Sequence, residues 1–331
     1  MKSLFDAPIA TQVSRKPRRI RTRPTRFKRI LVPIDFSRPS LKAIPYALAI
    51  ARQFGADVRL LHVVDTTEYP PPTLLTLPLV PQSEWNRRLR KRLEAVVLKY
   101  RVNGKVSALE PRSGTAYEEI CAIARELKAD LIVIATHGYT GYKHIYLGST
   151  AERVVQHSRC PVLVVRLHGI DWNGLRDPRT GKGFKLAKIL VPTDFSKCSR
   201  AGFDSGVQLA RDLNAELRVV HVINPHAYPL GDKYTALDAG RLMDEAAQAA
   251  QKQMRRMAAK AGVPYSCEVR RGSSAIEICK AANEDADLIV TSTHGRTGLG
   301  HVLIGSTAER VVRYARCPVL VIPTRPKSRK K

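Results

Sequence analysis

The sequence predicts an α/β protein built from two tandem domains, each with a parallel, doubly wound sheet. The segment at 135–165 returns at 292–322 with 20 of 31 positions identical and no gap. ILVPIDFS at 30–37 returns as ILVPTDFS at 189–196, at nearly the same offset. The period of about 158 residues corresponds to a whole domain, because solenoid and propeller repeats span ~20–50 residues.

Short β-branched runs alternate with amphipathic stretches along the first copy. Strands are expected at 29–34, 57–64, 105–110, 130–135 and 161–166, and helices at 38–54, 82–101, 115–128 and 149–158. The run DLIVIA at 130–135 is continuously apolar, which is typical of a strand covered on both faces by helices. A Pro-rich stretch at 69–81 connects the second strand to the second helix.

The second copy repeats this alternation of strands and helices. Strands are expected at 187–193, 216–223, 265–270, 287–292 and 318–322, and helices at 197–213, 237–261, 274–284 and 306–315. The fourth strand, DLIVTS, is again a buried type of run. Strands that alternate with helices favour a parallel sheet with helices on both faces.

Composition sets the expected domain boundaries. We expect a basic, disordered tail at 1–27, one domain at 28–168, a linker at 169–184, a second domain at 185–325 and a basic tail at 326–331. The linker is rich in Gly, Asp, Asn and Pro and shows no periodicity. The length of 331 residues agrees with two domains of ~150 residues each.

The chain is strongly basic, with a formal net charge of +27. Residues 1–30 carry ten Lys or Arg against one Asp, and 325–331 adds five more cations. This balance implies attraction to polyanions and indicates nothing about the fold. The tails either solubilise the chain or attach it, without sequence specificity, to nucleic acid or to an anionic surface.

Cysteine usage and hydropathy favour a cytoplasmic location. Four of the six cysteines occupy matching positions in the two copies, which indicates packing: Cys121 with Cys279 and Cys160 with Cys317. Because no CxxC pair occurs and the chain is not short, a disulfide framework or a structural zinc site is disfavoured. No run of 18 apolar residues is present, and no apolar export segment follows the paired arginines at 18–19.

Two repeated motifs fall where open α/β sheets bind ligands, beyond the carboxyl ends of the first and fourth strands. The first strand ends in PID at 33–35 and PTD at 192–194, and the fourth is followed by THG at 136–138 and 293–295. After nine intervening residues, GST at 148–150 and 305–307 opens the next helix. Backbone N–H groups at a helix N-terminus, together with the helix dipole, favour phosphate.

These residues resemble the universal stress protein family, whose nucleotide-binding members carry G-x-x-G-x9-G-[ST] together with an Asp after the first strand. The resemblance covers 28–168 and 185–325. It implies two flavodoxin-like domains of the adenine nucleotide alpha hydrolase type, each a five-stranded parallel sheet of order 3-2-1-4-5. It also implies an internal pseudo-dimer in which the final strands, 161–166 and 318–323, pair across a pseudo-twofold axis, and it leaves a homodimer open.

The resemblance also implies roles for individual residues. Adenine would be bonded by Asp35 and Asp194, and the base pocket would be lined by Val63 and Val222. The ribose would be bordered by Pro33 and Pro192, and the phosphates would be held by Gly138, Gly148, Ser149, Thr150, Gly295, Gly305, Ser306 and Thr307. The ligand would be ATP, or else AMP or ADP, with Mg²⁺ carried by the nucleotide rather than by a protein cage.

The chain departs from the family pattern at one motif position. The first glycine is replaced by Ala135 in one copy and by Ser292 in the other. Both residues are small, and their side chains either leave binding intact or weaken it where the backbone approaches the ribose. The two sites therefore need not be equivalent.

Each part of the motif also has a purely structural explanation. Ser149 and Ser306 fit the S/T-x-x-E capping box, so they could cap their helices and do no more. Asp35 and Asp194 could be N-caps or turn formers after the first strand. Three pairs of histidines recur between the copies, but their spacing and the lack of companion ligands make a metal site the weaker interpretation.

The sequence predicts a binding protein rather than a conventional enzyme. It contains neither the P-loop motif GxxxxGK[ST] nor a GxSxG elbow. The function that we expect is that of an ATP-binding stress-response protein whose nucleotide gates contact with a protein partner. Two alternatives stay open: a nucleotide-independent scaffold recruited to polyanions by the basic tails, and a slow ATPase.

Overall fold

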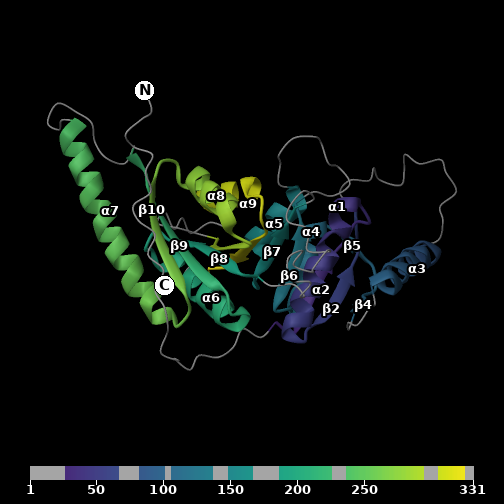
Figure 1. The fold of residues 1–331 in the computed structure, drawn as a ribbon. Coiled ribbons are helices and arrows are strands. Elements are labelled where there is room, and N and C mark those ends of the chain that lie inside the picture. Colours follow the sequence, from purple (N-terminus) through teal and green to yellow (C-terminus); the bar gives the residue numbers. More distant parts are fainter. Residues whose placement is uncertain are drawn as a thin grey trace, which may run out of the picture. The chain divides into compact units, whose positions relative to one another are not determined.

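The computed structural model describes residues 27–66, 82–100, 106–136, 148–166, 186–225, 236–293 and 305–324. The described residues form two compact units, one within 26–184 and one within 185–331, and Figure 1 draws the elements of each. Two predicted site residues, Gly138 and Gly295, lie outside the described residues, as do 1–26 and 325–331. Phe27, which was expected to end the basic tail, is instead buried against Phe54 in the first domain. Among the helices that are described, none is long and apolar enough to cross a membrane.

The first domain contains a five-stranded parallel sheet of order β4-β2-β1-β6-β7. In chain order this is 3-2-1-4-5, as the resemblance implied. A short parallel pair, β3 and β5, continues from the ends of β2 and β4. The elements are β1 (Arg29–Pro33), α1 (Arg38–Leu41), α2 (Ala43–Phe54), β2 (Asp57–Leu61), β3 (Val63–Asp65), α3 (Gln82–Tyr100), β4 (Val106–Ala108), β5 (Arg112–Gly114), α4 (Ala116–Glu126), β6 (Leu131–Ala135), α5 (Ser149–His157) and β7 (Val162–Val165).

The second domain repeats the topology, with the parallel order β10-β9-β8-β11-β12. Helices α8 and α9 pack against each other (Figure 1), while α6 and α7 both contact the sheet and border a shared groove. The elements are β8 (Lys188–Pro192), α6 (Lys197–Leu213), β9 (Glu216–Ile223), α7 (Ala236–Ala258), the 3₁₀ helix η4 (Ala259–Ala261), β10 (Tyr265–Arg271), α8 (Ser274–Asp285), β11 (Leu288–Ser292), α9 (Ser306–Tyr314) and β12 (Val319–Ile322).

The central strands form the core of each domain. All five residues of β6 and all five of β11 are buried, which confirms that the apolar runs are covered on both faces. The start of the first strand is held by a carboxylate from a loop about 100 residues away: Asp130 accepts from the N–H groups of Lys28 and Arg29, at 2.9 and 3.0 Å. Asp287 makes the same pair of contacts in the second domain.

The six cysteines are free thiols. Cys121, Cys279 and Cys317 are buried, as expected for packing residues, whereas Cys160 is half-buried. Burial raises the pKa of the Cys121 thiol to about 11 and that of Cys317 to about 12. These thiols are therefore protonated and poorly nucleophilic near neutral pH.

The first domain departs from the predicted elements at two places. The helix expected at 38–54 is divided at Lys42, whereas its counterpart α6 is continuous. The first copy has Pro39 and Pro45 where the second has Cys198 and Asp204. Pro45 cannot donate the i→i−4 bond that would carry the helix across Lys42.

The strand expected at 57–64 is also divided in the first domain. It breaks at His62 into β2 and β3, while β9 of the second domain runs unbroken. The partner strand breaks at the same level, since β3 pairs with β5 rather than with β4. The short strand β5 was not predicted, because RSG at 112–114 has neither alternation nor β-branched residues.

Candidate functional site

The turn after β1 holds a carboxylate in place through local hydrogen bonds. Ser37 N donates to Asp35 Oδ1 at 2.9 Å, and Asp35 N donates to Ser40 Oγ at 3.2 Å. Ser37 is the N-cap of α1, since its Oγ accepts from Ser40 N at 3.2 Å. The carboxylate of Asp35 is therefore fixed at the carboxyl end of the first strand.

The second domain builds the same turn. Ser196 N donates to Asp194 Oδ1 at 3.0 Å, and Ser199 N donates to Ser196 Oγ at 3.1 Å. The interpretation of both aspartates as turn formers is thus confirmed, and their interpretation as N-caps is wrong, because Ser37 and Ser196 cap the helices. A carboxylate can accept about four hydrogen bonds, so a turn contact and a ligand contact are compatible.

An aromatic pair lies beside each aspartate. Phe36 has φ of 62°, and its ring centroid is 4.6 Å from that of His62. His62 Nδ1 lies 2.8 Å from the carbonyl oxygen of Ile34, and since a carbonyl only accepts, Nδ1 carries the proton. Burial lowers the pKa of His62, which favours the neutral ring with an acceptor lone pair on Nε2.

The second domain contains the corresponding pair. Phe195 also has φ of 62°, its centroid is 4.7 Å from that of His221, and His221 Nδ1 donates to Thr193 O at 2.7 Å. In the first domain a cation–π contact adds to this pair, since the Arg92 guanidinium of α3 lies 4.2 Å from the Phe36 ring centroid. Arg92 could not be singled out from the sequence, because the basic composition of 82–101 does not show which arginine reaches this turn.

The end of the fourth strand is tied to the start of the following helix. Thr136 is 2% exposed, and its carbonyl oxygen accepts from Gly148 N at 2.6 Å. Thr293 is 4% exposed and accepts from Gly305 N at 2.7 Å. In each domain one backbone hydrogen bond therefore joins the end of the fourth strand to the residue that begins the next helix. The THG repeat contained this signal, but its threonine was not singled out.

Glycine, not serine, is the N-cap of each of these helices. Gly148 caps α5 and Gly305 caps α9, neither with a side-chain hydrogen bond, and Ser149 and Ser306 are exposed first residues. The capping-box interpretation of the two serines is therefore wrong. The glutamates of the expected capping boxes bond one turn further along their helices instead, since Glu152 accepts from Gln156 and Glu309 accepts from Arg313.

The topology brings these features to one edge of each sheet. Because β1 is hydrogen-bonded to β6 and β8 to β11, the aspartate turns and the glycine-capped helix starts follow adjacent strand ends. Val63 in β3 and Val222 in β9 are half-buried beyond the second strand at the same edge. Pro33 is buried, Pro192 is half-buried, and Thr150 and Thr307 occupy the first helical turns.

The two residues that replace the family glycine are buried. Ala135 is 7% exposed and Ser292 is 6% exposed, so each side chain is accommodated within the packed domain. Helix α6 approaches Ser292 through Gly202, where an added Cβ would lie 3.2 Å from Ser292 N. Within the described residues, no group of three or more His, Cys, Asp or Glu side chains is arranged to hold a metal ion.

Comparison with known proteins gives a consistent result. The model of the universal stress protein family matches residues 26–166 and 185–323. The universal stress protein MJ0531 of Methanocaldococcus jannaschii is 36% identical over 139 residues, which cover 41% of this chain and 81% of that protein. A universal stress protein of Mycolicibacterium smegmatis is 25% identical over 305 residues, covering 89% of this chain and 97% of the relative.

A solved structure shows the same fold over nearly the whole chain. The universal stress protein from Archaeoglobus fulgidus superposes with a TM-score of 0.67, covering 92% of this chain and 99% of that one. Its sequence identity is 23%, so this similarity supports the fold alone.

Proposed function

The chain belongs to the universal stress protein family, and we propose that each domain binds an adenine nucleotide beyond its first and fourth strands. The observation that carries the proposal is the duplication of the site's geometry. In both domains a serine N–H orients an aspartate, at 2.9 and 3.0 Å, beside a glycine-capped helix start. An exposed helix N-terminus presents N–H groups to an anion, and a carboxylate can accept from an adenine amino group.

ATP is the ligand that we propose, with Mg²⁺ bound to its phosphates. Asp35 and Asp194 would accept from the adenine, and the glycine-capped starts of α5 and α9 would hold the phosphates. A universal stress protein solved in complex with cAMP is 22% identical to this chain, covers 43% of it and has a TM-score of 0.33. The bound cAMP belongs to that protein's structure, so the proposal for this chain depends on this chain's own residues.

The biological role that we propose is regulatory. Nucleotide occupancy would order the segments at 138–150 and 295–307 and thereby change the surface offered to a protein partner in the cytoplasm. A second role, recruitment to a polyanion without nucleotide, is favoured by one observation, the net charge of +27. Deletion of 1–26 and 325–331 separates the two, because it spares the buried Phe27 and would abolish recruitment by the tails while leaving nucleotide binding intact.

The test is calorimetric titration of ATP at moderate salt into the full chain and into the Asp35→Asn/Asp194→Asn variant. Asn can keep the turn, because its Oδ1 still accepts from the serine N–H, but it lacks the charged acceptor. We expect two ATP per wild-type chain and affinity at least about tenfold weaker in the variant, the loss typical of a hydrogen bond to a charged group.

The matched control is Asp204→Asn, which removes an exposed carboxylate of α6 that is paired with Arg200 at 3.2 Å. Its titration should match that of the wild type. Equal ATP affinity in all three proteins would show that the two aspartates do not contribute to the nucleotide site. An absence of ATP binding by the wild type would leave polyanion recruitment as the function to pursue.

A further inference from the structure

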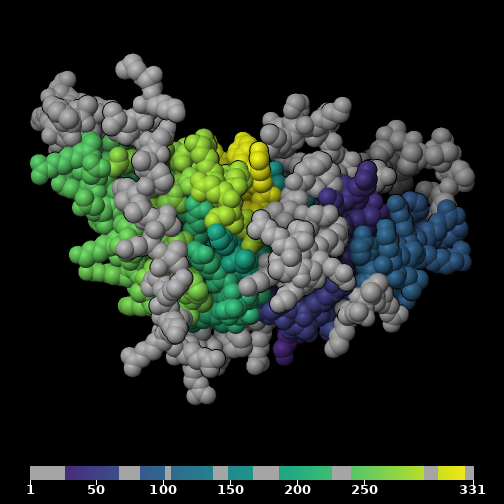
Figure 2. Space-filling model, in the orientation of Figure 1, coloured from purple at the N-terminus to yellow at the C-terminus, as the bar shows by residue number. Residues whose placement is uncertain are grey.

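The C-terminal half of α7 carries a continuous basic face. Lys252, Arg255, Arg256 and Lys260 are exposed, and their spacings of three, four and eight residues place them along one side of the helix and its 3₁₀ extension. The opposite side packs on the sheet, with Ala247, Ala250, Met254 and Ala258 all at most 5% exposed. We call the four cations the basic ridge. It points away from the domain core, and Figure 2 shows α7 in green at the surface.

The cations of the basic ridge have no acidic partners in the described part of the chain. No Asp or Glu occurs between 246 and 263, and no described salt bridge involves any of the four side chains. The N-terminal half of α7 differs, because Asp244 pairs with Arg271 and Glu245 pairs with Arg241. Charge on that half is neutralised within the protein, whereas charge on the ridge is left for an external anion.

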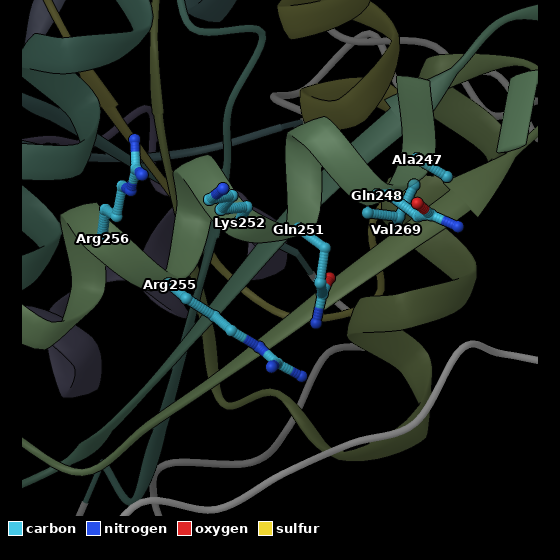
Figure 3. Close-up of a pocket in the computed structure, with 7 residues that line it drawn as sticks. All are labelled: Ala247, Gln248, Gln251, Lys252, Arg255, Arg256 and Val269. Atoms are coloured by element: carbon cyan, nitrogen blue, oxygen red, sulfur yellow. The ribbon is translucent and has the colours of Figure 1, made fainter. Parts of the chain in front are cut away.

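Two hollows flank the basic ridge. One, of about 360 Å³, lies between α7 and β10 and is lined by residues that include Gln248, Lys252 and Arg255 (Figure 3). The other, of about 440 Å³, lies between α6 and α7, and Arg256 borders both. In Figure 3 Arg255 and Arg256 extend from α7 in different directions, so the ridge can contact an anion along its length and on either side.

We propose that the basic ridge is a docking surface for the phosphate backbone of duplex nucleic acid. From residue 252 to 260 it spans about 12 Å at helical rise, and a duplex presents one negative charge per about 1.7 Å. No aromatic residue occurs between 246 and 262, so the ridge offers no platform for the unstacked bases of a single strand. Contact with phosphates alone makes binding independent of base sequence.

A lipid surface fits the basic ridge less well. Interfacial helices bury Trp, Phe or Leu side chains in the membrane while their cations face the headgroups. The exposed large apolar residues of the described chain are Trp85, Leu98, Leu242, Ile276 and Tyr314, and none of them lies between 246 and 262. The residues beside the cations are mainly alanine and glutamine.

The experiment measures, by fluorescence anisotropy, binding of a fluorescein-labelled, mixed-sequence duplex of about 20 base pairs between about 50 and 300 mM NaCl. Over this range the affinity of a protein that contacts several phosphates falls by roughly tenfold or more, so the salt dependence can be measured. The full chain is compared with the variant Lys252→Gln/Arg255→Gln/Arg256→Gln/Lys260→Gln. The control, Arg125→Gln/Arg159→Gln/Lys280→Gln/Arg316→Gln, removes the same charge from four exposed positions scattered over both domains. Both basic tails are present in all three proteins.

We expect the ridge variant to bind at least about tenfold more weakly at 150 mM salt, with the slope of log K against log salt reduced by about 3 to 4, the value for four phosphate contacts. The control should lose less than about one unit of slope. Equal losses in the two variants would overturn the proposal, since net charge would then explain the binding. The proposal would also be overturned if the ridge variant lost binding to phosphatidylserine vesicles but bound DNA as the wild type does, because the ridge would then be a membrane-binding surface.

Discussion

Ser37 and Ser196 cap their helices, whereas Ser149 and Ser306, which fit the capping-box pattern, do not. The difference lies in the residue before each helix, since Gly148 and Gly305 take the N-cap position of α5 and α9. A capping box depends on the backbone conformation of its first residue, which four sequence positions do not determine. The serines of the predicted phosphate site are therefore available for another role.

This arrangement predicts a difference in stability between the two kinds of serine. Ser37→Ala and Ser196→Ala should each lower the free energy of unfolding by about 1 kcal/mol, because each removes an N-cap acceptor. Ser149→Ala and Ser306→Ala should each change it by less than about 0.5 kcal/mol, as expected for an exposed position. Urea denaturation measures all four. Equal losses at positions 37 and 149 would show that Ser149 caps α5 after all.

His62 couples the stability of the first domain to pH. Burial lowers its pKa below the ordinary value of 6.5, so between the two values the unfolded chain binds a proton that the folded chain does not. His62 therefore favours the folded state fully above pH 6.5, and this contribution is lost as the pH falls through the folded-state pKa. Asp35 opposes the shift, because its negative charge favours the protonated ring, but burial is the larger effect.

The expected result is a free energy of unfolding that falls from pH 7 to pH 5, and falls less steeply in His62→Asn, whose amide can still donate to Ile34 O. Guanidinium denaturation at a series of pH values measures the slope, and the His62 ring signal in NMR reports its pKa directly. A measured pKa at or above 6.5 would contradict the assigned burial of the ring.

At the scale of elements, helix α6 packs more closely on its sheet than an alanine would allow. A Cβ at Gly206 would lie 2.4 Å from Val191 Cγ2, which is far inside van der Waals contact. The first copy has Ala47 at the equivalent position of α2, where the helix is interrupted at Lys42. The close approach in the second domain therefore depends on glycine at this position.

Gly206→Ala should lower the free energy of unfolding by about 1 to 3 kcal/mol through overpacking, despite the better helix propensity of alanine. Gly240→Ala is the matched control, because nothing lies within 4 Å of its added methyl group. That substitution should raise stability by up to about 1 kcal/mol. Thermal denaturation of both variants decides the matter, and a gain in stability at both positions would refute the close packing.

Most element boundaries were predicted to within two residues, because hydrophobic periodicity is a local signal. Gly55 ends α2 and Asn214 ends α6 in the left-handed conformation, with φ of 66° and 51°. The misses have other causes: Pro45 divides one helix, and a break shared with the partner strand divides one strand. Such breaks depend on a partner strand or a missing donor, which the period of the sequence does not report.

At the scale of the whole molecule, the two copies share a fold and differ in how they are stabilised. Arg218 of β9 is 12% exposed and pairs with Glu268, Glu284 and Asp285, at 2.5 to 2.6 Å. The equivalent Arg59 donates to Ser107 Oγ at 2.7 Å. The partners of Arg218 lie 50 to 67 residues away, so this network was not visible in the sequence. The expected pairing of the final strands across a pseudo-twofold axis stays a prediction.

The duplication and the fold of each domain could be predicted from the sequence, and the strand order from the family resemblance. The motifs also predict the strand ends at which a ligand would bind. These follow from repeats, periodicity and motif spacing, which are properties of neighbouring residues. Only the folded domains show which serines cap helices, which arginine reaches Phe36, and which cations on α7 lack acidic partners among the described residues. Those outcomes depend on side chains brought together from distant segments, and a linear pattern does not encode the distances between them.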